Sequence, residues 1–566
     1  MSKRTSGSNS AQFLMDGEDF FAAFVECLDE VKRSATDKSE SLSKPEDKSN
    51  VPTAVPENTY VRLAYWAMDP HLPLKIDEPA YTLEVALKEL ADLGVHVEII
   101  LWDPDLLTGN VGGSDNFATK VSDGNHLVDK LLHGYKDKIL VYLEGHPARL
   151  TKGVGLGLHQ KMALFSVRGK LKALVGGFNM EEEYWDTAYH HGKHPITDKG
   201  HTLHDTAVLV KGPVTLDIEE EWLRRWDRQV SSDSFMVWKG PPRYKVRGKV
   251  RGLLKDQPQS GGLAISVLTT GVSALGTEHS IRDEIKTLLQ GATSYVYAEN
   301  YQFFEPEIVT EICRKLKTQK QFQVCVVIPD QACDPSHANT QLSRIAYTRM
   351  LLASFKEKQG TKGKLDETLR SLRLQEAIDP VNNEQGVYYK VLDAKKPKSW
   401  MEGAKLQMRP APVEGQKGVS KPLEVALELI DGVDLTEGET PRVQFYCPVR
   451  FPSNSDHYDA STKIYVHSKL MIIDSRHVIV GSANFGHRSM QYDGEMSLHI
   501  HSDAFAIEVK QKLFPHYNVH SQKEVPAALR DDAHHAYDQV RLIPRSPGDF
   551  KVLKEKLPFA MDYSWF

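Results

Sequence analysis

One arrangement of residues occurs once in each half of this chain, and it constrains the fold more than any other feature. A histidine and a lysine, separated by one residue, lie in an apolar segment in both places, as His159 with Lys161 and His467 with Lys469. A glycine-rich turn ending in an asparagine follows each pair, over 176–179 and over 481–484. A lone His-x-Lys is uninformative, but two copies with matching turns indicate an internal duplication. The sequence therefore predicts two related halves that share one phosphate-handling site.

The pattern of apolar residues predicts the same order of elements around both copies. In the first half it predicts strands over 60–68 and 95–102, with a helix over 79–93 between them. In the second half it predicts helices over 279–290 and 305–317 and strands over 294–298 and 322–328. Strands that alternate with helices are typical of a parallel sheet covered by helices. We expect an α/β fold with two similar lobes, each a mostly parallel or mixed sheet flanked by helices, and the active site between them.

Changes in composition along the chain predict its domain boundaries. Apolar residues at helical spacing over 13–33, followed by a polar stretch with spaced prolines, predict an N-terminal helix and a flexible linker within 1–55. We expect this helix to dock on the body; binding to a membrane or to a partner is the alternative. The remaining predicted segments are a first lobe over 56–270, a second lobe over 271–356 and 441–530, an inserted lid or subdomain over 357–440, and a C-terminal tail over 531–566.

The overall composition is that of a soluble globular protein. The formal net charge of -6 disfavours a surface that grips nucleic acid throughout, although a local basic groove is compatible with it. The five cysteines form no Cys-x-x-Cys pair, which disfavours a disulfide framework and a thiolate zinc site. No stretch approaches the roughly 18–20 apolar residues that span a bilayer. We expect a soluble protein, cytoplasmic when synthesised, with no signal peptide or transmembrane segment; export by a signal-independent secretion system is the alternative.

The two His-x-Lys pairs suit chemistry at a phosphodiester. Alternate residues of a strand share a face, so each pair presents an imidazole and an ammonium group side by side. Lysine neutralises non-bridging phosphate oxygens, and histidine attacks phosphorus or transfers a proton near pH 7. Displacement at phosphorus is in line, so one histidine must attack while a second protonates the leaving oxygen. A single pair would more often be a half-exposed strand with a surface lysine, and only the duplication favours catalysis.

The segments around both pairs resemble a known family. The sequence HSKLMIIDSRHVIVGSANFG over 467–486 is similar to the HxKxxxxD…GSxN block of the phospholipase D superfamily, with Asp474 as its aspartate. The segment over 298–304 is similar to the ENQYF-like strand end of that family. The resemblance covers about residues 56–520. Features of the first half resemble the lipid-cleaving branch of the family, namely Tyr184-Trp185-Asp186-Thr187, His204-Asp205, Gly212-Pro213, Trp222 and Trp226.

The resemblance implies a two-step, metal-independent reaction that uses no cofactor. It implies His159 as the nucleophile and His467 as the general acid and then base, although the residues themselves leave this order open. Asp205 and Glu495 stand where the family keeps a carboxylate against an active histidine; without the family, each is more simply a solvated surface carboxylate. The remaining residues implied to bind the phosphate oxygens or to support the site are Lys161, Lys469, Asn179, Asn484, Ser482, Gly177 and Asp474.

The chain departs from the family pattern in two places. Ser166 occupies the position of the first motif that corresponds to Asp474, and a serine keeps one hydrogen bond but not the charge. About 55 residues precede the first lobe, too few for the calcium-binding C2 or phosphoinositide-binding PX/PH modules of the large plant and animal enzymes.

A histidine-rich stretch over 190–204 raises the question of a metal. A zinc site made of His190, His191 and His194 is one interpretation, but the stretch contains no cysteine and no evident set of carboxylate ligands. We therefore expect no metal and a mobile loop at the mouth of the pocket.

The predicted function is a phospholipase D that hydrolyses glycerophospholipids to phosphatidic acid at a membrane surface, with no nucleic-acid partner. A phosphatidyl transferase of the cardiolipin synthase kind and a nuclease or other phosphodiesterase of the superfamily are the alternatives. A non-catalytic lipid-binding relative is disfavoured because both histidines and both lysines are present. A lipase without a signal peptide also resembles interbacterial phospholipase D effectors, which would imply an immunity or delivery partner.

Overall fold

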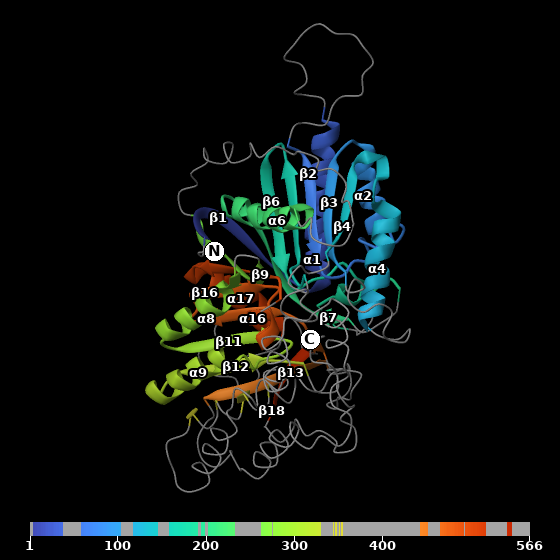
Figure 1. The fold of residues 1–566 in the computed structure, drawn as a ribbon. Helices are drawn as coiled ribbons and strands as arrows, with labels where there is room; N and C mark the ends of the chain where they lie inside the picture. Colours follow the sequence, from blue (N-terminus) through green and yellow to red (C-terminus); the bar gives the residue numbers. More distant parts are fainter. Residues whose placement is uncertain are drawn as a thin grey trace, which may run out of the picture.

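A mixed sheet of 16 strands organises the protein (Figure 1). The structure is a computed structural model. We call residues 4–231 the first half and residues 262–516 the second half. The structure describes residues 4–37, 58–103, 117–144, 158–188, 190, 194–197, 202–231, 262–273, 276–329, 442–450, 464–491, 493–516 and 540–545, together with 343, 346, 347, 350, 353 and 354.

The first half alternates strands and helices as the apolar pattern predicts. The predicted strands and the helix between them are confirmed as β2, β3 and α2, with ends that differ by a few residues. Its elements are β1 Arg4–Met15, α1 Asp16–Thr36, β2 Tyr60–Tyr65, α2 Leu83–Asp92, β3 His96–Trp102, α4 Phe117–Leu132, η1 Tyr135–Asp137, β4 Ile139–Glu144, β5 Met162–Val167, β6 Lys170–Gly176, η2 Glu182–Tyr184, β7 Leu203–His204, β8 Thr206–Lys211 and α6 Val214–Ser231.

The second half follows the same plan. The predicted helices and strands before residue 330 are confirmed as α8, α9, β11 and β12. The predicted insertion over 357–440 lies outside the described residues, and within the predicted tail only a strand, β18 Val540–Arg545, is described. The elements are β9 Leu263–Ser273, β10 Gly276–His279, α8 Ser280–Gly291, β11 Tyr295–Asn300, α9 Pro306–Thr318, β12 Gln323–Val327, β13 Val443–Arg450, β14 Tyr465–Val466, β15 Lys469–Ile473, β16 His477–Gly481, α16 His487–Gln491, β17 Glu495–His501 and α17 Asp503–His516.

The strand order shows the duplication directly. The order β4-β3-β2-β5-β6-β8-β1 in the first half recurs as β13-β12-β11-β15-β16-β17-β9 in the second. In both halves the first three strands are parallel and the following ones antiparallel. β1 and β9 pair with each other, with Arg4 opposite Val267, so the halves join edge to edge. The α/β class is confirmed, and in place of two separate sheets the structure has one sheet with two repeated halves.

Helices cover both faces of this sheet. One apolar cluster under α6 and α17 contains residues of both halves, including Trp222, Val267, Leu498 and Leu513. The opposite face of the first half is covered by α1, α2 and α4, and that of the second half by α8 and α9. α2 illustrates the local cause: it buries one helical face from Leu83 to Leu90 and ends before Gly94, which has the positive φ of 87° common after a helix.

The N-terminal segment differs from its prediction. The helix predicted over 13–33 begins at Asp16, because the residues before it form β1 in the middle of the sheet, between β8 and β9. α1 packs on the first half through buried side chains that include Phe20 and Phe24. Residues 4–36 are therefore part of the first half and not an appendage. No helix in the described ranges is both long and apolar enough to cross a membrane.

Candidate active site

Each His-x-Lys segment pairs with the opposite half of the protein. The backbone N–H of His159 donates to the Gly494 carbonyl at 3.0 Å, next to a parallel bridge between Leu158 and Gly494. In the same way β14 pairs with β7, and the N–H of His467 donates to the His204 carbonyl at 2.8 Å. The motif histidines thus lie just before β5 and β15, not within a strand as predicted. This crossing places each histidine beside a segment of the other half.

Two histidine–carboxylate pairs result from this crossing. His159 Nδ1 lies 2.8 Å from Glu495 Oε1, and His467 Nδ1 lies 2.6 Å from Asp205 Oδ2. Both carboxylate side chains are fully buried, whereas the imidazoles are 17% and 13% exposed. A carboxylate on Nδ1 fixes the ring and leaves Nε2 for chemistry. The two carboxylates implied by the resemblance therefore occupy equivalent positions in the two halves.

The two lysines lie close to the histidines. Lys161 Nζ donates to the His159 carbonyl at 2.8 Å, and Lys469 Nζ donates to the His467 carbonyl. Both lysine side chains are almost completely buried. The charges of both lysines, and of His159, act on the pKa of His467. The protonation states of the four motif residues therefore depend on one another.

Burial changes the protonation of these four residues. It lowers the pKa of Lys161 to about 7 and that of Lys469 to about 8. Burial likewise lowers the pKa of both histidines, that of His467 well below its ordinary range. The two lysines and two histidines are buried close together and disfavour one another's positive charge, so an anion such as a phosphodiester would stabilise their charged forms.

The two carboxylates differ in protonation. Burial alone would raise the pKa of Glu495, but His159 and Lys161 counter it and the pKa lies below its ordinary value. Burial raises the pKa of Asp205 to about 7, only partly offset by Lys469. Glu495 is therefore the more readily ionised of the two, while the carboxyl group of Asp205 can hold a proton near neutral pH beside His467.

Three of the predicted phosphate-binding and supporting residues contact protein groups. Asn179 is buried and its amide donates to the Tyr184 hydroxyl at 2.9 Å. Ser482 Oγ donates to Glu495 Oε2 at 2.5 Å, so it positions that carboxylate. At Gly177 a Cβ would lie 2.0 Å from Asp205 Oδ1, so the glycine makes room for the other carboxylate. Asn484 is 9% exposed, and its Oδ1 has no hydrogen-bond partner among the described atoms, which suits a contact with a ligand.

Asp474 and Ser166 do not lie with the motif residues. Asp474 follows β15 at the end opposite to Lys469, about 16 Å along the strand at ~3.3 Å per residue. Its carboxylate accepts hydrogen bonds from the backbone N–H groups of residues 293–295 at the start of β11. Ser166 lies near the corresponding end of β5, as its second-to-last residue, and donates to the Asn58 carbonyl just before β2. The sequence grouped Asp474 with the site residues, but in the structure its carboxylate holds the start of β11.

Several aromatic residues at the site escaped sequence analysis. Trp66 follows β2 and its ring lies 5.9 Å from that of His159. Tyr301 follows β11 at the equivalent place and lies 6.4 Å from His467, which Tyr184 also contacts edge-on at 5.2 Å. The signal was available, because both aromatics directly follow equivalent strands of the repeat. Glu181 is a further omission: burial raises its pKa to about 8, and Lys161 lies near enough to counter this.

Comparisons with known proteins found a matching family and several similar proteins. A family described as "Cardiolipin synthase, PLD-like domain" matches residues 443–515, which include His467, Lys469 and Glu495. Residues 443–515 therefore match a PLD-like domain, and the chain is similar to two curated phospholipase D proteins. Phospholipase D alpha 4 of Arabidopsis thaliana is 20% identical over 496 residues, covering 76% of this chain and 57% of the plant protein. Phospholipase D A of Dictyostelium discoideum is 22% identical over 555 residues, covering 88% of this chain and 34% of the amoeba protein.

Among solved structures, phosphatidylserine synthase of Haemophilus influenzae Rd KW20 aligns with 96% of this chain and 90% of its own, at 11% identity and a TM-score of 0.47. The chain spans less than two thirds of the length of the two phospholipase D relatives above.

Proposed function

We propose that this chain is a phospholipase D, which hydrolyses the head-group phosphodiester of glycerophospholipids to phosphatidic acid at a membrane surface. The observation that carries the proposal is the pair of crossed histidine–carboxylate contacts with two lysines beside them. Two imidazoles from opposite halves meet the requirement of in-line displacement for an attacking group and a proton donor. The names of the two curated relatives support the lipid substrate.

The unequal carboxylates support His159 as the nucleophile. Ionised Glu495 holds Nδ1–H of His159, so Nε2 keeps its lone pair and attacks phosphorus while the P–O bond to the head group breaks. His467 gives the proton on its Nε2 to the departing alcohol oxygen, and the proton of the Asp205 carboxyl group moves to Nδ1 on the opposite side of the ring. In the second step His467 takes a proton from water, the water oxygen bonds to phosphorus, and the P–N bond to His159 breaks. Phosphatidic acid leaves and both histidines return to their starting states.

The experiment tests substrate and order together. The full chain is incubated with vesicles of phosphatidylcholine, phosphatidylethanolamine, phosphatidylglycerol or cardiolipin, and separately with DNA. We expect head-group release from at least one lipid, lost on the order of 10³-fold or more in His159→Ala and in His467→Ala. We expect His467→Ala to accumulate a phosphoryl group on His159, detectable by mass spectrometry of alkaline-quenched samples. Label on His467 in His159→Ala would reverse the assignment, and cleavage of DNA without lipid turnover would refute the lipid substrate.

A phosphatidyl transferase is the second candidate, favoured by the family description that matches the second half. Transfer differs from hydrolysis only in the second step, where an alcohol replaces water as the attacking group. Adding glycerol to the phosphatidylcholine reaction separates the two, because a transferase yields phosphatidylglycerol as the main product whereas the proposed hydrolase yields phosphatidic acid.

Action as an interbacterial effector, with an immunity or delivery partner, remains a prediction from resemblance alone. Expression of the chain in the periplasm of a susceptible bacterium tests it. We expect growth arrest with the unaltered chain and none with His159→Ala. Harmless periplasmic expression of an active enzyme would contradict the prediction.

A further inference from the structure

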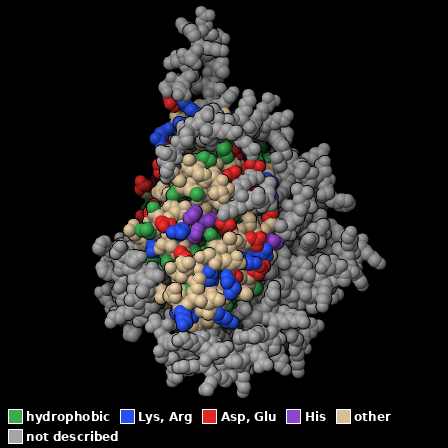
Figure 2. Space-filling view, turned by 90° about the vertical axis from the view of Figure 1, so that its left-hand side faces the viewer, with side chains coloured by type: hydrophobic (Ala, Val, Ile, Leu, Met, Phe, Trp, Pro, Cys, Tyr) green, Lys and Arg blue, Asp and Glu red, His purple; other side chains and the backbone are tan. Residues whose placement is uncertain are grey.

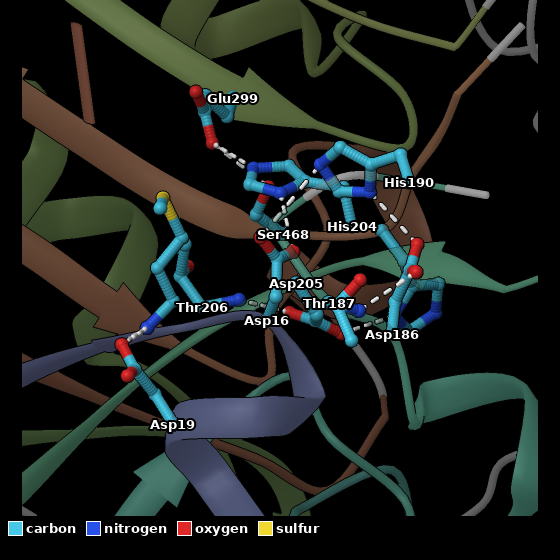
Figure 3. Close-up of polar contacts among 12 residues, drawn as sticks. Asp16, Asp19, Asp186, Thr187, His190, His204, Asp205, Thr206, Glu299 and Ser468 are labelled. Carbon is cyan, nitrogen blue, oxygen red and sulfur yellow. Dashed lines mark hydrogen bonds and ion pairs between the residues drawn. The ribbon is translucent and has the colours of Figure 1, made fainter. Parts of the chain in front are cut away.

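A second group of polar side chains lies behind the His467 pair, outside the phosphate site (Figure 3). His204 Nδ1 lies 2.7 Å from Asp16 Oδ1, and His190 Nε2 lies 3.7 Å from Asp16 Oδ2. All three side chains are no more than 2% exposed. They come from three separate places: the start of α1, the segment after η2, and β7. We call Asp16, His190 and His204 the buried triad.

Each imidazole of the buried triad contacts a second carboxylate through its other nitrogen. His190 Nδ1 lies 2.7 Å from Asp186 Oδ2, and His204 Nε2 lies 3.1 Å from Glu299 Oε2. Glu299 is itself held by the Ser468 hydroxyl at 2.9 Å. This is the arrangement found around metal-binding histidines, where a carboxylate on the far nitrogen fixes the tautomer and orientation of the ring. Figure 3 shows both outer carboxylates directed at the imidazoles from opposite sides of Asp16.

We propose that the buried triad binds a divalent transition-metal ion of the zinc type, with Asp186 and Glu299 as outer carboxylates. The ligand atoms of the triad all lie within 4.8 Å of one another. Zinc bonds of ~2.0–2.2 Å to histidine nitrogen and carboxylate oxygen place neighbouring tetrahedral ligands about 3.3 Å apart. The observed separations of 2.7 and 3.7 Å lie on either side of that value, so small side-chain shifts suffice. Two imidazoles and one carboxylate also form a ligand set that zinc and iron(II) proteins use.

Two of the proposed ligands have an unusual backbone conformation, which supports a functional site. Asp16 has φ 61° and His190 has φ 46°, a left-handed conformation that residues other than glycine seldom adopt. Such conformations persist where the surrounding structure requires them and concentrate at functional sites. At Asp16 the conformation is held by its N–H, which donates to the Asp205 carbonyl at 2.9 Å.

The ion would have a structural role. It would join the start of α1 to β7 and, through Glu299 of β11, to the second half. It would not contact the phosphate-site histidines, since His467 meets this region through its backbone N–H and through Asp205. The sequence predicted no metal and considered His190 only with His191 and His194, of which His191 lies outside the described residues. The ligands found here lie far apart in the chain.

The test measures metal directly and needs no turnover. The full chain is purified from zinc-supplemented cells, and bound metal is determined by plasma mass spectrometry. Variants Asp16→Asn and His190→Ala remove one ligand each, and far-UV circular dichroism reports whether they fold. His477→Ala is the matched control, because His477 is a half-buried sheet histidine that contacts His499 within a group of histidines. Figure 2 shows histidine side chains gathered on the face that carries β16 in Figure 1.

We expect one zinc ion per chain in the unaltered protein and in His477→Ala, and loss of that ion in the two ligand variants. A chain stripped with dipicolinate should regain thermal stability on addition of Zn²⁺ but not Mg²⁺, and Co²⁺ should give visible absorption that Zn²⁺ abolishes. If the variants do not fold, this experiment on the stripped, unaltered chain tests the proposal by itself. Absence of bound metal together with no response of the stripped chain, or equal metal in all variants, would overturn the proposal. The metal content of His159→Ala should equal that of the unaltered protein. The metal measurement therefore remains valid even if the chain has no phosphodiesterase activity.

Discussion

Asp474 belongs to the motif by sequence, yet its contacts predict that its loss lowers stability and not turnover. Its carboxylate accepts four hydrogen bonds, from the N–H groups of Thr293, Ser294 and Tyr295 and from the Thr293 hydroxyl, at 2.6–3.0 Å. Most of these donors are exposed and can bind water instead, so each bond contributes about 0.5–1 kcal/mol. Asp474 also has φ 53°, where alanine is disfavoured by about 1 kcal/mol. Asp474→Ala should therefore lower the free energy of unfolding by about 3–5 kcal/mol.

The assay compares thermal unfolding with turnover in the same samples. For a cooperative unit of several hundred residues, 1 kcal/mol corresponds to about 1–2 °C, so Asp474→Ala should unfold roughly 3–10 °C earlier. Asp474→Asn keeps one acceptor oxygen and tolerates the left-handed backbone, so its shift should be smaller than half of that. Asp77→Ala, at an exposed carboxylate, is the matched control and should unfold with the unaltered protein. Head-group release at 25 °C should stay within threefold in all three. A hundredfold loss of turnover with unchanged unfolding would refute the structural role.

Three further predictions concern the site itself. Gly177→Ala should lower kcat on the order of 100-fold or more, because the new Cβ would lie 2.0 Å from Asp205 Oδ1. Gly291→Ala is the control and should leave kcat unchanged, since its Cβ would meet open space. Equal kcat values in the two variants would contradict the predicted clash. Because the pKa of Lys161 is about 7, its side chain is a charged ammonium group below that pH and neutral above it. Inhibition by sulfate should therefore weaken about tenfold or more between pH 6.5 and 9. An inhibition constant that does not change with pH would exclude this lysine as the anion site. Ser166→Asp should change turnover by no more than about an order of magnitude, since the side chain contacts the backbone at Asn58 and not the site; abolished turnover in a folded variant would show otherwise.

The parts of the fold that depend on local periodicity could be predicted from sequence. α2 and β3 are found where their apolar spacing places them, since a helix and a fully buried strand each have a recognisable period. β1 could not be found in this way: RTSGSNSAQFLM is polar for most of its length, and its position follows from pairing with β8 and β9. Tertiary pairing decides such a strand, not its own side chains.

The motif residues could be singled out from the sequence, but their arrangement in space could not. The spacing of His159 with Lys161 indicated phosphate chemistry, yet nothing local indicates that the partner of this histidine is Glu495 of the other half. Trp222 and Trp226 show that a residue can match a family signature and yet lie away from the site. They resemble a lipid-branch signature, but both are buried in the apolar cluster under α6, so they stabilise the fold and do not contact a substrate. Tyr184, from the same signature, does contact His467.

The central position of β1 has a consequence for the order in which the chain can fold. Residues 4–15 are synthesised about 200 residues before β8 and about 250 residues before β9. Until then β1 has two unpaired edges, and contacts between residues so distant in sequence form slowly. The polar composition of β1 disfavours aggregation while the strand is unpaired, whereas an apolar strand of that length would be prone to aggregate. Closure of β1 between β8 and β9 would then be the late step that brings the two halves, and with them the two histidine–carboxylate pairs, into register.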